Sequence, residues 1–203
     1  MVSYRIGTPE HRKSAYAWYC MDRQSEGYKK DMEIWEGMDW RLCECKKQKA
    51  RNWQVRLQED IRVNANSKFV TYTFTEHELQ KLDNEIKGLN GYDRDNEICR
   101  LAVRRYTERW RKKYGKTLRH WLVTELGHQN TERVHMHGIV WTDKVKDIKE
   151  IWKYGKVWIG DYVSAKTINY IVKYVNKVDE VHKTYNSKIF TSKGIGSKYL
   201  ERR

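Results

Sequence analysis

The alternation of apolar and polar residues predicts short strands and amphipathic helices in a mixed order along the chain. Apolar runs rich in branched and aromatic residues predict strands at residues 68–75, 118–125, 133–141 and 156–163. Helical periodicity predicts helices near residues 44–60, 76–87, 97–114, 144–153 and 164–178. A turn is expected from Gly88 to Asp93. This order of elements fits either a parallel α/β sheet or an antiparallel α+β sheet.

One pair of predicted strands favours the antiparallel arrangement. The strands at residues 118–125 and 133–141 are joined by a short segment that contains the turn-forming residues Gly127 and Asn130. Two strands joined in this way form a hairpin, which parallel strands cannot do over so short a connection. The hairpin therefore favours an α+β fold with an antiparallel sheet.

The second strand of this hairpin carries a candidate metal site. His135 and His137 lie on one face of the strand, because successive side chains point to opposite faces. In the hairpin Glu125 can lie opposite His135, with Cβ atoms roughly 4.5–5.5 Å apart. Two imidazoles and one carboxylate can bind a divalent metal and leave positions open for a phosphate oxygen. The alternative interpretation is a pair of surface histidines at a sheet edge.

The helix predicted at residues 164–178 has an aromatic and basic stripe opposite an aliphatic one. With about 100° per residue, the first stripe contains Tyr170, Lys173, Tyr174 and Lys177. A free phenol has a pKa near 10 and is a poor nucleophile at neutral pH. A lysine one turn away lowers that pKa and neutralises charge on a phosphate, so the stripe predicts tyrosine nucleophiles for phosphodiesters. Alternatively, the tyrosines pack at the edge of the core and the lysines are solvated.

These motifs, taken together, resemble those of HUH (His-hydrophobic-His) rolling-circle replication initiators, most closely the initiator of the microviruses, small phages with circular single-stranded DNA. The matching stretches are residues 68–75, Glu125 with residues 135–137, residues 170–177, the Cys-rich basic segment at 43–56, and the landmarks at 158–160 and 192–196. The resemblance extends from about residue 40 to the C-terminus. It implies an α+β fold with a central antiparallel sheet and an RRM- or ferredoxin-like palm. Helices are expected on one face, with the tyrosine helix beside the metal site.

The resemblance also implies a reaction and its participants. A tyrosine attacks the scissile phosphate, giving a 5′-phosphotyrosine and a free 3′-OH, and the second tyrosine later allows strand transfer and circle closure. Tyr170 and Tyr174 would alternate as nucleophiles with Lys173 and Lys177 as charge-stabilising partners. Glu125, His135 and His137 would bind Mn²⁺ or Mg²⁺. The implied partners are a single-stranded DNA origin and the host replication helicase and polymerase, in the bacterial cytoplasm.

Two other classes of function stay open. One is a single-strand transposase or plasmid relaxase of the same superfamily, against which the paired tyrosines and the Cys-rich segment argue. The other is a non-catalytic protein that binds or packages single-stranded DNA and whose histidines are structural. A covalent protein–DNA band on a denaturing gel separates the enzymes from the second class.

Composition agrees with a nucleic-acid enzyme. The chain has 41 basic and 27 acidic residues, a net charge of +14, and nine tryptophans and 14 tyrosines that can stack on unpaired bases. The expected backbone contacts are Lys46, Lys47, Arg104, Arg105, Arg109, Arg111, Lys112, Lys113 and Lys193. Each basic run can also be a solvated helix face. No run approaches the ~20 apolar residues of a membrane span, and residues 1–5 lack the apolar core of a secretion signal.

The cysteines and the N-terminal region complete the prediction. Cys43 and Cys45 are one residue apart, whereas zinc knuckles usually have two residues between their cysteines. Cys20 and Cys99 can complete a zinc site only if the fold brings them close, and reduced thiols are the expected state. We expect a basic, aromatic-rich arm at residues 1–60 and an HUH endonuclease domain at residues 61–203.

Overall fold

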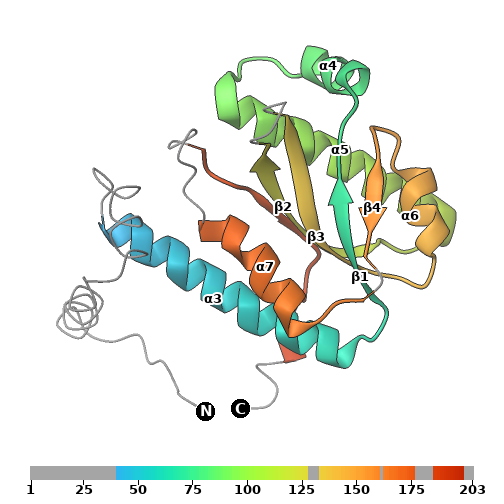
Figure 1. Cartoon of the computed structure of the whole chain (residues 1–203). Coiled ribbons are helices and arrows are strands. Elements are labelled where there is room, and N and C mark those ends of the chain that lie inside the picture. Colours follow the sequence, from blue (N-terminus) through green and yellow to red (C-terminus); the bar gives the residue numbers. More distant parts are fainter. Residues whose placement is uncertain (1–39, 128–132, 161, 177–184, 199–203) are drawn as a thin grey trace.

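The predicted apolar runs assemble into one five-stranded antiparallel sheet in the computed structural model, which describes residues 40–127, 133–160, 162–176 and 185–198 (Figure 1). The strands are β1 (Ser67–Tyr72), β2 (Arg119–Leu126), β3 (Val134–Trp141), β4 (Val157–Ile159) and β5 (Ile189–Thr191). Their order across the sheet is β4-β1-β3-β2-β5, and every neighbouring pair is antiparallel. The expected α+β class and antiparallel sheet are confirmed.

Helices connect and cover these strands. They are α3 (Trp40–Val63), α4 (Glu76–Glu85), α5 (Gly91–Tyr114), α6 (Val145–Ile151) and α7 (Ala165–Asn176). The side chain of Thr75 caps α4 by accepting the Glu78 N–H. Helix α5 begins earlier than expected, at Gly91, so the predicted turn is wrong beyond Asn90. Asn90 occupies the N-cap position and Asp93 places an acidic group in the first turn, and both features favour a helix start there.

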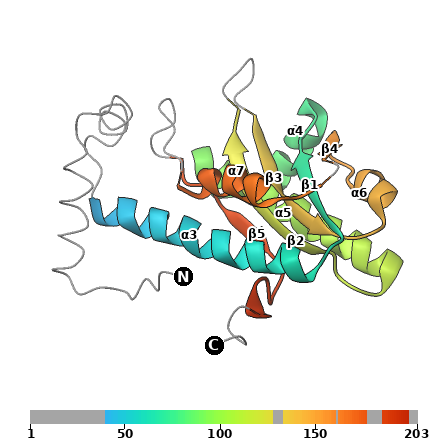
Figure 2. The ribbon, with the colours of Figure 1, turned by 60° about the horizontal axis from the view of Figure 1, so that its bottom comes forward.

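The helices cover both faces of the sheet, which corrects the expectation that they pack on one face. Alternate strand residues such as Val70 and Met136 join one core cluster with α5, and their neighbours Phe69 and Ile139 join a second cluster with α3 and α7. Figures 1 and 2 show α5 behind the sheet and α3 beside α7 in front of it. Both faces of β2 and β3 carry apolar side chains, so each face requires a helical cover.

The hairpin of β2 and β3 has the predicted register. Glu125 pairs with His135, and Val123 pairs with His137. Gly138 follows directly, at a point where a Cβ atom would overlap the carbonyl oxygen of Trp121. A larger residue at position 138 would therefore push β3 away from β2 and shift the histidines relative to Glu125.

Two features of the fold lie outside the sequence prediction. Strand β5 was not predicted, because its three residues are too few to show a period, and it forms by pairing with the edge of β2. Helix α3 runs through residue 60, and its Ala50 and Leu57 lie in the second core cluster. The division into an arm and a domain at residue 60 stays a prediction. Among the described helices, none is long and apolar enough to cross a membrane.

Candidate metal centre and tyrosine pair

Glu125, His135 and His137 converge on the face of the sheet that α3 and α7 cover. One carboxylate oxygen of Glu125, Oε2, lies 3.2 Å from Nε2 of His135 and 2.9 Å from Nε2 of His137. The candidate ligand atoms of the three residues all lie within 4.8 Å of one another. Among the described residues this is the one group of three or more such side chains with metal-ligand spacing.

The outer nitrogens of both imidazoles have their own partners. Nδ1 of His137 lies 3.0 Å from Oγ1 of Thr71 on β1, and Nδ1 of His135 lies 3.3 Å from the carbonyl oxygen of Arg133. A carbonyl oxygen only accepts, so Nδ1 of His135 carries the proton and Nε2 keeps its lone pair. The same tautomer of His137 donates to Thr71. This arrangement suits imidazoles that bind a cation through Nε2.

Helix α7 presents the two tyrosines to this cluster. Its aliphatic stripe is buried as predicted, with Ile168 and Ile171 inaccessible to solvent and Val172 and Val175 in the same core cluster. The backbone of Ser164 accepts the Ile168 N–H and so begins the helix. The opposite stripe faces the sheet edge and solvent, where Tyr170 is 47% exposed.

The tyrosine rings contact the metal cluster directly. The ring of Tyr174 is stacked on His137, with centroids 4.8 Å apart and an interplanar angle of 13°. Tyr170 meets the same imidazole edge-on at 6.4 Å. The hydroxyl of Tyr174 donates to the hydroxyl of Tyr170 over 2.6 Å. Both phenolic oxygens therefore lie together beside His137.

Electrostatics leave Tyr174 protonated in the protein alone. Burial raises the pKa of its phenol far above the ordinary value of 10, and the hydrogen bond to Tyr170 and the charge of Glu125 raise it further. The expectation that a neighbouring lysine lowers this pKa is wrong for Tyr174. Lys173 is exposed, and Lys177 lies outside the described residues.

A pocket of about 770 Å³ joins these groups into one site. Its lining includes the three candidate metal ligands, both tyrosines, Thr71 and Arg133. Arg133 was not selected from the sequence, where it is one of many basic residues. In the structure it stands at the pocket and pairs with Glu76 over 2.8 Å.

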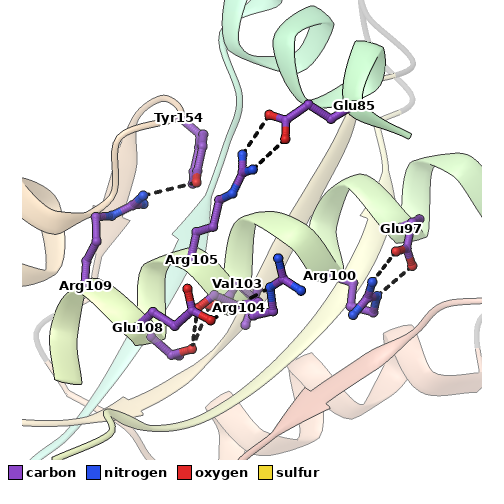
Figure 3. A network of polar contacts seen from close by, with 10 residues as sticks. Glu85, Glu97, Arg100, Val103, Arg104, Arg105, Glu108, Arg109 and Tyr154 are labelled. Atoms are coloured by element: carbon purple, nitrogen blue, oxygen red, sulfur yellow. Dashed lines mark hydrogen bonds and ion pairs between the residues drawn. The ribbon is translucent and has the colours of Figure 1, made fainter. Parts of the chain in front are cut away.

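Most of the expected DNA-binding residues lie elsewhere. Arg104, Arg105, Arg109, Arg111, Lys112 and Lys113 belong to α5, on the face of the sheet opposite the metal cluster. Several are already paired: Arg105 binds Glu85, and Arg109 donates to the hydroxyl of Tyr154 (Figure 3). Lys113 pairs with Asp147. Their contact with DNA stays a prediction, as does that of Lys46 and Lys47 on α3 and of the exposed Lys193.

The cysteines do not come together in the described part of the chain. Cys45 is exposed on α3, whereas Cys99 is fully buried in the cluster on the other face of the sheet. Both are free thiols. Cys20 and the side chain of Cys43 lie outside the described residues, so a zinc site that includes them stays untested.

Comparison with known proteins gives one match. A family model for the replication-associated protein ORF2 matches residues 67–179, which is more than half of the 203 residues. The matched stretch begins at β1 and includes the metal cluster and both tyrosines. The search of curated proteins and the search of solved structures give no match.

Proposed function

Because this chain belongs to the replication-associated protein ORF2 family, a family of rolling-circle replication initiators, we propose that it nicks a single-stranded DNA origin and remains joined to the DNA through a 5′-phosphotyrosine. The nucleophiles are Tyr170 and Tyr174, and the cation ligands are Glu125, His135 and His137. The proposal is supported most directly by the stacking of Tyr174 on His137 within one pocket.

The donor set of this pocket fits a divalent cation. Both Nε2 atoms face one carboxylate oxygen, and the outer nitrogens are held by Thr71 and a backbone carbonyl. A divalent cation bound there would supply Lewis-acid polarisation of a phosphate oxygen. Nitrogen ligands make the site softer than an all-oxygen site, so Mn²⁺ as well as Mg²⁺ suits it.

The tyrosine step follows from the position of the two hydroxyls. The phenolic oxygen of one tyrosine forms a bond to the phosphorus and releases its proton to water. The bond from phosphorus to the 3′ oxygen breaks, and this oxygen takes up a proton to give a free 3′-OH. The second hydroxyl lies 2.6 Å from the first. It can therefore attack a later phosphate at the same place and reverse or transfer the linkage.

The raised pKa of Tyr174 gives the cation a second role in this proposal. The carboxylate of Glu125 disfavours the phenolate in the protein alone. A positive charge at the cluster offsets that carboxylate and favours the phenolate, which is the nucleophilic form. Activation of the tyrosine then depends on the cluster rather than on Lys173 alone.

A covalent-adduct assay tests the proposal. The protein is incubated with end-labelled single-stranded DNA of randomised sequence and Mn²⁺, and the products are separated on a denaturing gel. We expect a labelled protein band, and sequencing of the DNA in that band identifies the origin. The double variant Tyr170→Phe/Tyr174→Phe should form no band.

Tyr162→Phe is the matched control, because Tyr162 is a tyrosine that is 73% exposed and lies outside the pocket. It should form the adduct as the unchanged protein does. If no labelled band forms with any sequence, or if the double variant still forms one, the proposal is wrong. Tight DNA binding without a band would favour a non-catalytic single-strand-binding protein.

A further inference from the structure

Exposed aromatic rings gather at one edge of the sheet. Among the described residues five large hydrophobic side chains are exposed, and the three aromatic ones are Trp158, Tyr162 and Tyr170. All three lie within residues 158–170, which form β4, the following loop and the first part of α7. An exposed cluster of rings that the core does not use is typical of a binding surface.

Trp158 stands on the same face of the sheet as the metal cluster. It pairs with Thr71, the residue whose hydroxyl contacts His137. Its indole meets the ring of Phe69 edge-on at 5.5 Å, and Phe69 lies 6.2 Å from the ring of His137. Trp158 is thus two ring contacts from a candidate cation ligand.

The indole is held in place yet left open. A Cβ atom at Gly160 would lie 3.1 Å from Cη2 of Trp158, so the glycine leaves room for the ring against the strand. Phe69 is buried and fixes the other neighbour of the indole. Even so, the side chain is 58% exposed. A fixed ring with a free surface can stack on another flat ring at small entropic cost.

Positive charge surrounds this ring. Lys156 precedes Trp158 by two residues, and Lys166 and Lys173 lie on α7. All three are exposed, and none has an acidic partner in the described ranges. Lysines around an aromatic ring complement a chain of phosphates with bases between them.

We propose that Trp158 stacks on an unpaired base of the DNA strand whose scissile phosphate occupies the pocket, with Lys156 beside it at the backbone. This inference rests on the proposed function for the position of that phosphate. With stacked bases about 3.4 Å apart along a strand, two ring contacts correspond to about two to four nucleotides. Trp158 is a positioning residue that holds this base and so fixes the strand. A base in a duplex is covered by its neighbours, so the platform selects unpaired DNA.

Binding to two matched strands tests the proposal. Fluorescence anisotropy is measured with labelled oligothymidine of about 20 nucleotides, longer than the site of a single binding fold, and with a strand of equal length in which every base is replaced by an abasic spacer. EDTA is present, so cleavage does not contribute. We expect Trp158→Ala to weaken binding of oligothymidine about 5- to 150-fold and to leave binding of the abasic strand unchanged. Trp158→Phe should keep most of the affinity.

Two further variants separate stacking from charge and from folding. Lys156→Ala should weaken both strands alike and reduce the slope of log affinity against log salt by about 0.7. Leu89→Ala removes an exposed side chain between α4 and α5 and should change neither strand. Thermal unfolding of each variant confirms that the fold is intact.

Three results would overturn the inference. They are an unchanged affinity of Trp158→Ala for oligothymidine, an equal loss on the abasic strand, and an equal loss on a blunt duplex. These results are independent of the adduct assay. If adducts form but Trp158→Ala binds normally, the platform is wrong and the proposed function stands. A base-dependent loss without adducts keeps the platform in a protein that binds single strands without cleaving them.

Discussion

The hydroxyl of Thr71 lies 3.0 Å from Nδ1 of His137, so the first strand of the sheet holds a candidate cation ligand on the third. This contact fixes the imidazole so that Nε2 faces Glu125. Partners of this kind commonly change metal affinity by about 10- to 100-fold. The two strands are far apart in the sequence and meet through the antiparallel pairing of β1 with β3.

Thr71→Val should weaken Mn²⁺ binding about 10- to 100-fold, because the isosteric methyl cannot accept the Nδ1–H of His137. Isothermal titration calorimetry measures this affinity. Thr73→Val is the matched control, since Thr73 also lines the pocket but its hydroxyl donates to the carbonyl oxygen of Lys156. Equal affinities for the Thr71 variant and the unchanged protein would contradict the assigned role of the hydroxyl.

His135→Ala should abolish Mn²⁺ binding and adduct formation while the fold persists. His135 is only partly buried, and its removal leaves the core clusters untouched. Mn²⁺ should support adduct formation at least as well as Mg²⁺, because imidazole ligands favour the softer ion. His77→Ala, at an exposed histidine on α4, is the control. Adduct formation by His135→Ala at the unmodified rate would refute the metal assignment.

The two tyrosines should divide the reaction between them. Tyr170→Phe and Tyr174→Phe should each keep some single-turnover nicking, since both hydroxyls lie beside His137. Both variants should be impaired in multiple-turnover strand transfer, because a second nucleophile is then absent. Peptide mapping of the adducts identifies the residue that attacks first. Normal strand transfer by Tyr170→Phe would mean that the enzyme works with one nucleophile.

Stability should fall in mild acid through His120. This histidine is buried, and burial lowers its pKa below the ordinary value of 6.5. Below about pH 6.5 the unfolded chain binds a proton that the folded chain does not, so stability is present above that pH and lost as the pH falls. The slope from this group is up to about 1.4 kcal/mol per pH unit.

Urea unfolding at about pH 7 and about pH 5, on either side of the ordinary histidine pKa, measures this effect. His120→Gln should lose less stability between these pH values than the unchanged protein does. His77→Gln should lose the same amount as the unchanged protein, because the His77 side chain is 74% exposed. An identical pH dependence in the His120 variant would show that another group causes the acid sensitivity.

Gly196→Ala should destabilise the attachment of the C-terminal segment to α3. Gly196 has φ +69°, and a Cβ atom there would overlap Arg56. Its N–H donates to the buried carboxylate of Asp60, which also binds the guanidinium of Arg119. We expect a loss of roughly 1–2 kcal/mol from the left-handed backbone, with about 1–3 kcal/mol more from the overlap.

Gly88→Ala is the matched control for that loss. Gly88 has φ +74°, but nothing lies within 4 Å of a Cβ atom placed there. It should therefore show the backbone cost alone in urea unfolding. If both variants lose the same free energy of unfolding, the contact of Gly196 with Arg56 has no energetic weight.

The sequence by itself determined the local parts of the site. Period-two alternation placed His135 and His137 on one face, and the short connection to Glu125 set the hairpin register. Helical periodicity separated the buried stripe of α7 from the stripe with Tyr170 and Tyr174. These relationships span few residues, and backbone geometry alone decides them.

Only the tertiary structure decided how these parts meet. Thr71 and Trp158 lie far from the histidines along the chain, and pairing of β1 with β3 and β4 brings them to one face. The cover of both faces by helices, and the separation of the basic helix α5 from the pocket, depend on which side each connection crosses. The raised pKa of Tyr174 likewise arises from burial beside Glu125, because desolvation and charge depend on distance in space rather than on spacing in the sequence.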